Sequence, residues 1–151
     1  MSHAEWMGQA SNDLAAAKLL SNAGHHSQAV WLAFQAVEKA HKAILVALGL
    51  QYEDKHFKSL GHNTQEIARL LPAALHHPID LEIAVKISNL NSRAENCRYP
   101  SPPKGLPSAP VLAPLSRIAS SNEDVANAEL LLRWCQERVE RALRASAAMQ
   151  P

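Results

Sequence analysis

The sequence predicts an all-α protein, built as an up-and-down four-helix bundle with an additional short helix. Apolar residues make up 47% of the 151 residues and charged residues 19%, so the chain can bury a core of its own. Five glycines, and more alanine and leucine than valine and isoleucine, leave little material for strands and hairpin turns. Apolar residues recur at helical spacing in several segments, and the length fits one domain over residues 1–151.

The first helix is expected over Ser2 to Asn22. Apolar or small residues recur there at helical intervals, and the pattern stops near Asn22 and Gly24. The recurring residues are Trp6, Ala10, Leu14, Ala17 and Leu20.

The second helix is expected to begin after Ser27 and to end at Gly49. It carries two neighbouring stripes that step by four and three residues, namely Val30, Phe34, Val37, His41, Ile44 and Leu48, and Ala29, Ala33, Ala36, Ala40, Ala43 and Ala47. Together the stripes form an apolar arc wider than a surface helix needs, which predicts the central helix of the bundle. The width also favours burial beyond one bundle, and leaves open whether this helix faces a second subunit.

Two helices are expected in the middle of the chain. Thr64 is a predicted cap for a short helix over Gln65 to Leu71, closed off around Pro72. Pro78 suits the first turn of a fourth helix, which should fade before residue 100. Its core stripe is expected at Ile79, Ile83, Ile87, Leu90 and Ala94.

The chain before the last helix is rich in proline. Six of the nine prolines fall from Pro100 to Pro114, where the restricted, donor-poor backbone forms neither helix nor central strand. We therefore expect residues 99–121 to be an extended connector inside the single domain.

The last helix is expected to follow a cap at Ser121 or Asn122. Its first turn holds Glu123 and Asp124, which the helix dipole favours at that end. Its core stripe is predicted at Val125, Ala128, Leu132, Cys135, Val139 and Ala142.

Eight histidines raise the question of a metal site. His25 with His26 and His76 with His77 are adjacent pairs, which point about 100° apart on a helix and cannot share an ion. No HxxxH spacing or CxxC pair occurs, so we expect neither a metal nor a cofactor, and most histidines should be solvated. His41 interrupts an apolar stripe and is expected to be a core imidazole, hydrogen-bonded to backbone or to a carboxylate.

The net charge and the targeting signals narrow the classes of protein to which this chain could belong. The formal net charge of +1 argues against coating of nucleic acid, so any anion site must be local. Cys97 and Cys135 are too few for a disulfide framework, and the chain shows no signal peptide or apolar run of about 18 residues. These features favour a cytoplasmic protein. Glycine-rich phosphate loops and esterase motifs are also missing from the sequence.

The fourth helix carries a polar stripe with two interpretations. Its members are Glu82, Lys86, Asn89, Arg93 and Asn96. The plain interpretation is a solvated face with a Glu82–Lys86 ion pair. The functional interpretation places Arg93, Arg98 and Tyr99 around a phosphate and a base, with guanidiniums on the anion and a phenol stacked on the ring. In a structural alternative, Arg98 bonds loop carbonyls and Tyr99 anchors the loop.

Several segments together resemble the HEPN family of small helical bundles. They begin with Trp6, SNDL at 11–14 and AAAKLL at 15–20. The strongest is AVWLAFQAVEKAHKAIL at 29–45, which is similar to the Gln-x-x-Glu-Lys-x-x-Lys-x-x-Leu helix of the family. The Arg98-Tyr99-Pro100 turn, NED at 122–124 and LRW at 132–134 complete a resemblance over nearly the whole chain.

The resemblance implies a four-helix core with a short fifth helix, dimerisation, and frequent pairing with a minimal nucleotidyltransferase encoded next door. Many members are ribonuclease toxins that carry an Arg and a His separated by four to six residues. In those members the two side chains attend the phosphate and the 2′-hydroxyl. This chain departs from that pattern, because no histidine follows His77 and neither Arg93 nor Arg98 begins the motif. Arg69 and His76 match it literally, but this match begins in the short third helix, has Pro72 inside it, and does not follow the fourth helix.

The leading hypothesis is therefore a non-hydrolytic HEPN-like protein, either a homodimeric partner or a nucleotide-responsive module of a nucleotidyltransferase, in a toxin–antitoxin-like pair. Arg93, Arg98 and Tyr99 would form an anion-facing edge that binds nucleotide or RNA, oriented by Glu38 and Lys42.

Two alternatives stay open. One is a metal-independent endoribonuclease that uses Arg69 with His76, or His41, as its catalytic groups. The other is an interaction scaffold without a ligand.

Overall fold

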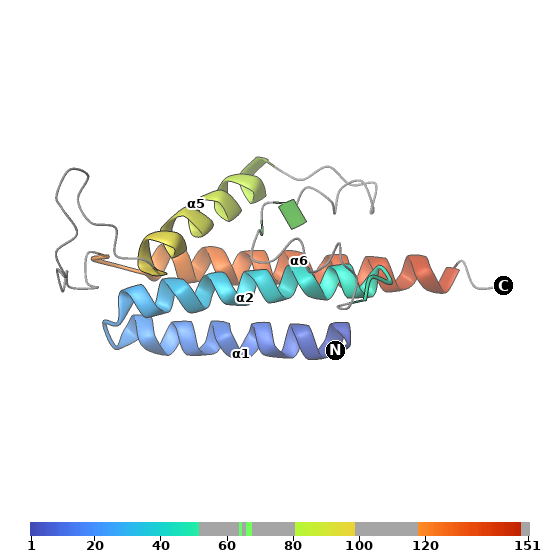
Figure 1. Cartoon of the computed structure of the whole chain (residues 1–151), viewed down its shortest axis with the longest axis horizontal. Helices are drawn as coiled ribbons and strands as arrows, with labels where there is room; N and C mark the ends of the chain where they lie inside the picture. Colours follow the sequence, from blue (N-terminus) through green and yellow to red (C-terminus); the bar gives the residue numbers. More distant parts are fainter. Residues whose placement is uncertain (52–63, 65, 68–80, 99–117, 149–151) are drawn as a thin grey trace, which may run out of the picture.

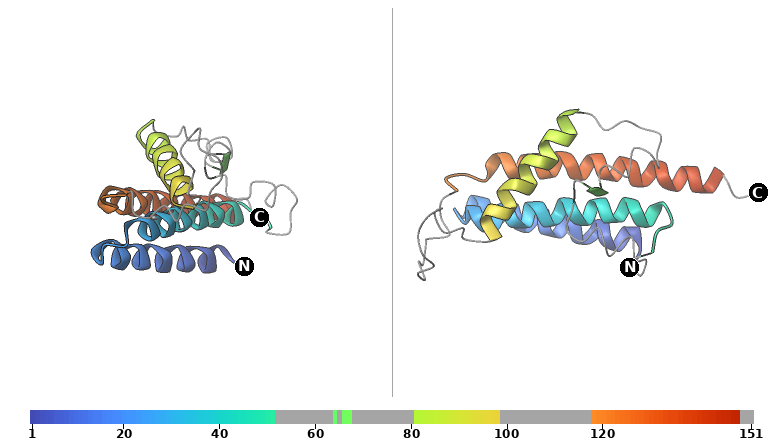
Figure 2. Two further views of the ribbon diagram at one scale, coloured as in Figure 1. Left: turned by 60° about the vertical axis from the view of Figure 1, so that its left-hand side comes forward. Right: turned by 45° about the horizontal axis from the view of Figure 1, so that its top comes forward.

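The computed structural model describes residues 1–51, 64, 66–67, 81–98 and 118–148, with the backbone alone for Asn96 and Arg98. Its helices are α1 (His3–Asn22), α2 (His26–Ala47), α5 (Leu81–Arg98) and α6 (Asn122–Ala148). Successive helices run in opposite directions, and α5 crosses the others obliquely (Figure 1, Figure 2). These residues contain no strand, so the predicted all-α, up-and-down bundle is confirmed.

Helix α1 begins at a capping box. The Ser2 hydroxyl accepts a hydrogen bond from the Glu5 N–H (3.2 Å), and the Glu5 carboxylate accepts one from the Ser2 N–H (2.6 Å). Both hydrogen bonds lower the pKa of the Glu5 carboxyl, and the bond with the backbone of Ser2 has the larger effect. The helix ends at Asn22, and Gly24 adopts a φ of +80° in the turn into α2. Both predicted ends of this helix are confirmed to within one residue.

Helix α2 is the central helix, as its two stripes predicted. Every member of both stripes except Leu48 is buried. Helices α1, α5 and α6 of the same chain all pack against it. The width of its apolar arc is therefore explained within one bundle, and the stripes offer no face to a second subunit. The helix ends at Ala47, two residues before Gly49, which has a φ of +91°.

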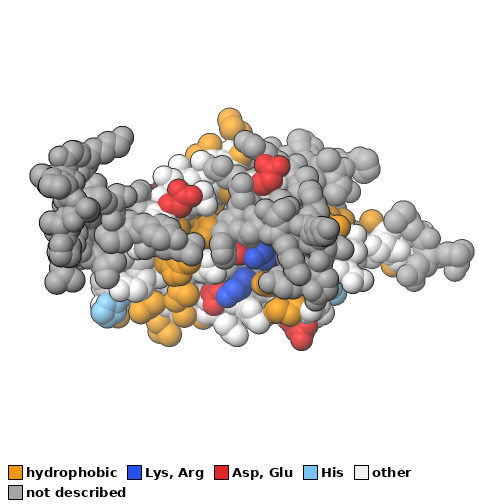
Figure 3. Space-filling view, in the orientation of Figure 1, with side chains coloured by type: hydrophobic (Ala, Val, Ile, Leu, Met, Phe, Trp, Pro, Cys, Tyr) orange, Lys and Arg blue, Asp and Glu red, His pale blue; other side chains and the backbone are white. Residues whose placement is uncertain are grey.

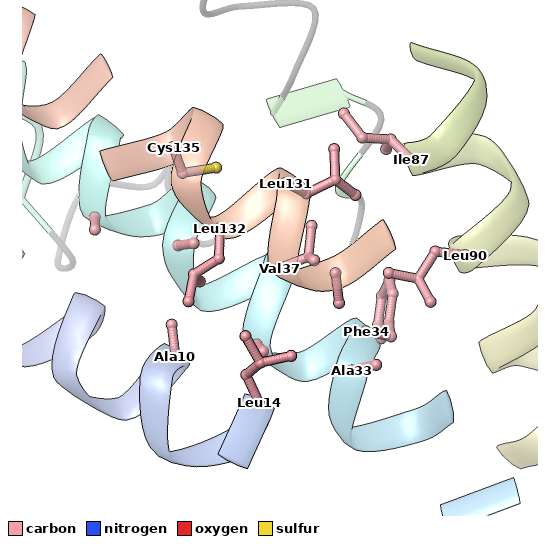
Figure 4. Packing of buried hydrophobic residues seen from close by; sticks show 14 of the residues in the cluster. Ala10, Leu14, Ala33, Phe34, Val37, Ile87, Leu90, Leu131, Leu132 and Cys135 are labelled. Atoms are coloured by element: carbon pink, nitrogen blue, oxygen red, sulfur yellow. The ribbon is translucent and has the colours of Figure 1, made fainter. Parts of the chain in front are cut away.

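Helices α5 and α6 bury the stripes that periodicity predicted. Along α6 every expected core position is buried, and along α5 all are except Ile79, which lies outside the described residues. Figure 4 shows Leu132 of α6 directed toward α1, Leu131 of α6 directed toward Ile87 of α5, and Leu90 of α5 near Phe34 of α2. No helix in the described ranges is apolar and long enough to cross a membrane.

Other sequence predictions fall largely on segments that the structure does not describe. Thr64, Glu66 and Ile67 have helical backbone, so Thr64 lies within a helical turn and not at the predicted cap position. The remainder of the expected short helix and Pro78 are outside the described residues, as is the connector up to residue 117. Residues 118–121 are non-helical and lead into α6.

Candidate functional site

Four helix ends meet where α6 begins. Ser21 lies at the end of α1, His26 begins α2, and Arg93 is in the second half of α5. These parts of α1, α2 and α5 lie at the end of the bundle where α6 starts (Figure 1). All three side chains bond to residues 120–124 at the start of α6. We call these three side chains and residues 120–124 the α6 junction.

A bidentate ion pair joins α5 to α6 at the junction. Arg93 Nε donates to Asp124 Oδ1 (2.6 Å) and Nη2 donates to Oδ2 (2.8 Å). Nη2 also donates to the carbonyl oxygen of Ser120 (3.0 Å). The hydrogen bond with Asp124 is the main cause of a raised pKa of Arg93. The Asp124 side chain is 6% exposed and that of Arg93 44%, so the guanidinium bridges a buried carboxylate and the surface.

A chain of side-chain hydrogen bonds joins the other three helices. His26 Nδ1 lies 2.9 Å from the Ser121 hydroxyl. Ser121 donates to the Ser21 hydroxyl (2.7 Å), and Ser21 donates to the side-chain oxygen Oδ1 of Asn122 (3.0 Å). Ser121 and Ser21 are buried and His26 is partly exposed. The start of α6 is therefore fixed to α1 through Ser21 and to α2 through the partly exposed imidazole of His26.

Cys97 ties the end of α5 to the beginning of α2. It lies one turn after Arg93 and has a side-chain hydrogen bond with Ser27. Burial raises the pKa of the Cys97 thiol. The protonated thiol is a poor nucleophile, so Cys97 serves this junction as a packing and hydrogen-bonding group.

Glu38 and Lys42 form a second polar cluster, further along α2. Lys42 Nζ donates to Glu38 Oε1 (2.5 Å), and Gln35 donates to Glu38 Oε2 (3.3 Å). The Lys42 ammonium lies 5.4 Å from the centre of the Trp6 ring on α1. Figure 3 shows basic and acidic side chains side by side over the middle of α2. The side chains of Glu38 and Lys42 are 2% and 12% exposed, so this pair within α2 lies inside the bundle, where Lys42 also contacts Trp6 of α1.

The two polar clusters lie apart. Ser27 marks the position of the α6 junction along α2, and Glu38 follows it by about 16 Å at 1.5 Å per residue. The structure thus brings Glu38 and Lys42 together and places Arg93 with Asp124. Any influence of Glu38 and Lys42 on Arg93 is transmitted through the helix and not by contact.

The other predicted site residues are only partly described. Arg98 is the last residue of α5, and its side chain is outside the description. Tyr99, Arg69 and His76 lie in segments that the structure does not describe. The Glu82–Lys86 ion pair expected on the polar stripe is present, with Nζ and Oε1 3.4 Å apart.

His41 is a core imidazole, as the plain interpretation of the sequence predicted. Its Nδ1 donates to the Val37 carbonyl oxygen (2.8 Å) and lies 3.7 Å from the Cys135 sulfur. The residue has no exposed surface, and burial is the main cause that lowers its pKa to about 4. Its Nε2 has no hydrogen-bond partner in the described part of the chain. A neutral imidazole enclosed in this way does not touch a substrate.

Sequence reasoning missed the His26 contact and the Arg93–Asp124 pair. It assigned His26 to solvent and Asp124 to the helix dipole, whereas both bond to residues distant in sequence. Nothing in the spacing of single residues marks such long-range pairs. Among the residues that the structure describes, no three His, Cys, Asp or Glu side chains are placed to hold a metal ion.

Comparison with known proteins identifies the class of this bundle. The family model of the HEPN domain matches residues 3–138, so the chain belongs to the HEPN domain family. The crystal structure of an archaeal HEPN homologue is similar to this fold, with a TM-score of 0.67 and 20% sequence identity. The match covers 92% of this chain and 98% of the archaeal one. A comparison with curated proteins found no match.

Proposed function

We propose that this protein is a cytoplasmic, non-hydrolytic HEPN module that responds to a nucleotide and acts as the homodimeric partner of a nucleotidyltransferase, in a toxin–antitoxin-like pair. The observation that carries the ligand site is the Arg93–Asp124–Ser120 clamp. The clamp fixes α5 against the start of α6. Its arginine lies about one and a half turns before Arg98 on α5. HEPN domains often oligomerise, which supports the dimer.

In this proposal the ligand binds beside the clamp. Arg93, Arg98 and Tyr99 form the anion-facing edge, with the two guanidiniums on a phosphate and the phenol on a base. Glu38 and Lys42 contribute at a distance, because their buried pair holds α2 against α1 and so fixes the helix that the junction rests on. Asp124 neutralises much of the charge of Arg93, so we expect micromolar rather than nanomolar affinity.

Replacing Arg98 by alanine is expected to abolish nucleotide binding without unfolding the bundle. The wild-type chain should gain thermal stability with a saturating nucleotide, because a ligand that binds only the folded state raises its stability by mass action. The variant should show no such gain. Arg144→Ala, at an exposed arginine near the end of α6, is the matched control and should behave as the wild type. An equal gain in wild type and Arg98→Ala would remove Arg98 from the site. A wild-type chain that gains nothing from any nucleotide would favour the scaffold without a ligand.

If the chain forms a homodimer, it should sediment at tens of micromolar as a particle of about 33 kDa, twice the mass of one chain. A stable dimer should bury more than about 1,000 Å² in total. Because α2 is covered within the chain, this area must come from other faces of the bundle. Sedimentation as a monomer at that concentration would contradict the proposed dimer.

The endoribonuclease alternative has a separate test. Expression of a ribonuclease toxin should arrest growth, and Arg69→Ala or His76→Ala should relieve the arrest. We expect no such arrest, because the histidine of the ribonuclease motif is missing after the fourth helix and His41 is enclosed in the core. Growth arrest by the parent, relieved by either variant, would replace our proposal with the ribonuclease.

A further inference from the structure

Helix α1 has an outer face that no other described helix covers. The helix forms the lower edge of the bundle in Figure 1, and its opposite side packs against α2 and α6. Its exposed residues recur every three or four positions, so they form one strip along the helix. The middle of this strip consists of Ala4, Gly8, Ser11, Ala15 and Leu19. We call these five residues the α1 strip.

The outer face of α1 is apolar and nearly without charge. Leu19 is 71% exposed. Glu5 is the only charged residue among the exposed positions of α1, which the structure describes throughout. Solvent-facing helix surfaces are normally rich in charged residues, and α6 of the same chain follows that rule. Its exposed residues include Glu123, Arg133, Glu137, Glu140, Arg141 and Arg144. Depletion of charge is typical of the core of a protein–protein interface.

The α1 strip is self-complementary in an antiparallel arrangement of two copies. A twofold axis at the midpoint of the strip places Ala4 opposite Leu19 of the second copy, and Gly8 opposite Ala15 of the second copy. The one large side chain therefore meets a small one. Along the rest of the strip only small residues face each other, so the two helices can approach closely. A Cβ added at Gly8 would meet nothing within 4 Å, which leaves this space open for another chain.

The same axis brings opposite charges together beside the strip. At about 100° per residue, Glu5 and Lys18 flank the strip on opposite sides, and each lies about 10 Å from the axis along the helix. In the antiparallel arrangement Glu5 therefore lies beside Lys18 of the second copy, and this contact occurs twice. The Lys18 side chain is 44% exposed while it pairs with Glu129, so its ammonium can donate to a second carboxylate. A parallel arrangement would instead place Glu5 beside Glu5.

We infer that a second copy of this chain docks on the α1 strip, through an antiparallel contact of two α1 helices around a twofold axis between Ser11 and Asn12. This inference rests on the homodimer of the proposed function and adds the face by which it forms. Because α2 is covered within the chain, the dimer needs another face, and the α1 strip combines exposed apolar surface with complementary charge.

Gly8→Arg tests the strip without weakening the fold. Arginine has a higher helix propensity than glycine, and at this position it meets nothing in the single chain. At a dilution where both proteins are monomeric, the variant should therefore unfold at the same temperature as the wild type or higher. In the dimer its guanidinium would be enclosed between two close helices, so association should weaken by about tenfold or more. Sedimentation equilibrium measures both association constants.

Ala84→Arg is the matched control. It adds the same side chain to an exposed position of α5, beside the exposed Leu81 and Val85, which form a competing apolar surface. The variant should dimerise as the wild type does. A dimer that is lost in Ala84→Arg and kept in Gly8→Arg would move the interface to α5 and overturn the inference.

Charge reversal tests the antiparallel direction. Glu5→Lys sets two lysines side by side at each end of the strip, and Lys18→Glu sets two glutamates there. Each variant should weaken the dimer about five- to tenfold. The double variant Glu5→Lys/Lys18→Glu should restore association, because opposite charges meet again. It still lacks the Glu5 cap on Ser2 and the Lys18–Glu129 pair, so restoration cannot come from within one chain. Association that stays weak in the double variant would contradict the antiparallel arrangement.

The outcomes distinguish this inference from the proposed function. A wild-type chain that stays monomeric at tens of micromolar would overturn both the homodimer and this interface. A dimer that is equally stable in the wild type and in Gly8→Arg would overturn the interface and leave the homodimer standing.

Discussion

Replacing Arg93 by alanine should destabilise the fold by about 2–3 kcal/mol, the largest effect we expect from a single polar substitution. The variant leaves the 6%-exposed Asp124 carboxylate without its bidentate partner and removes the bond to the Ser120 carbonyl. Half-exposure of Arg93 lets water reach the carboxylate, which keeps the loss below that of a fully buried pair. Urea unfolding at neutral pH measures the difference.

The surface pair of Lys18 and Glu129 provides the matched control. Both side chains are 44% exposed and their charged atoms are 2.9 Å apart, so Glu129→Ala should cost at most about 0.5 kcal/mol. A double-mutant cycle of Arg93→Ala with Asp124→Ala isolates the coupling of the junction pair. A coupling as small as that of the surface pair would show that the clamp does not hold α5 to α6.

Acidification should destabilise the protein through His41. Burial lowers the pKa of this imidazole from about 6.5 to about 4, so the unfolded chain takes up the proton at a higher pH than the folded chain does. The contribution of neutral His41 to the free energy of unfolding is therefore fully present above pH 6.5. It is lost as the pH drops from 6.5 to 4. The loss attributable to this residue is about 3 kcal/mol. Urea midpoints measured from pH 7 down to pH 4 give the dependence.

His41→Met separates this effect from the titration of carboxylates. Methionine is apolar and flexible enough to fill the site, and it has no proton to gain. Hydrogen bonds lower the pKa of the Glu5 and Glu129 carboxyls in both proteins. The effect of these carboxyls on the pH dependence of the free energy of unfolding therefore cancels in the comparison. The variant should lose about 3 kcal/mol less than the wild type over the same pH range. Parallel pH profiles would mean that the folded protein accommodates a charged His41.

Local periodicity was sufficient to predict most of this fold. The stripes of α2 place His41 in the same line as Val37 and Ile44, and a residue on such a line is buried whatever its polarity. Gly49 was a reliable end signal because only a residue that tolerates positive φ completes this turn. Helix direction followed from short links, such as the turn at Gly24.

The site was harder to predict because its bonds cross long stretches of sequence. Ser121 and His26 are 95 positions apart, and their contact depends on how α2 and α6 dock. Arg93 was predicted to face a ligand, and the nearby first turn of α6 turned out to hold its carboxylate partner. In contrast, Glu38 and Lys42 are four residues apart on one helix, where a pair forms locally. The sequence alone could not predict how far the Glu38–Lys42 pair lies from Arg93, because that distance depends on how α2 and α5 pack.

The most direct test of the account is a titration of the ¹⁵N-labelled chain with a nucleotide, followed by backbone NMR. Ligand binding at the α6 junction predicts that the largest changes in chemical shift cluster at residues 93–98, at 118–124 and at His26, with little change at Glu38 and Lys42. Changes confined to the far end of α6, or no changes at millimolar nucleotide, would contradict a ligand site at the α6 junction.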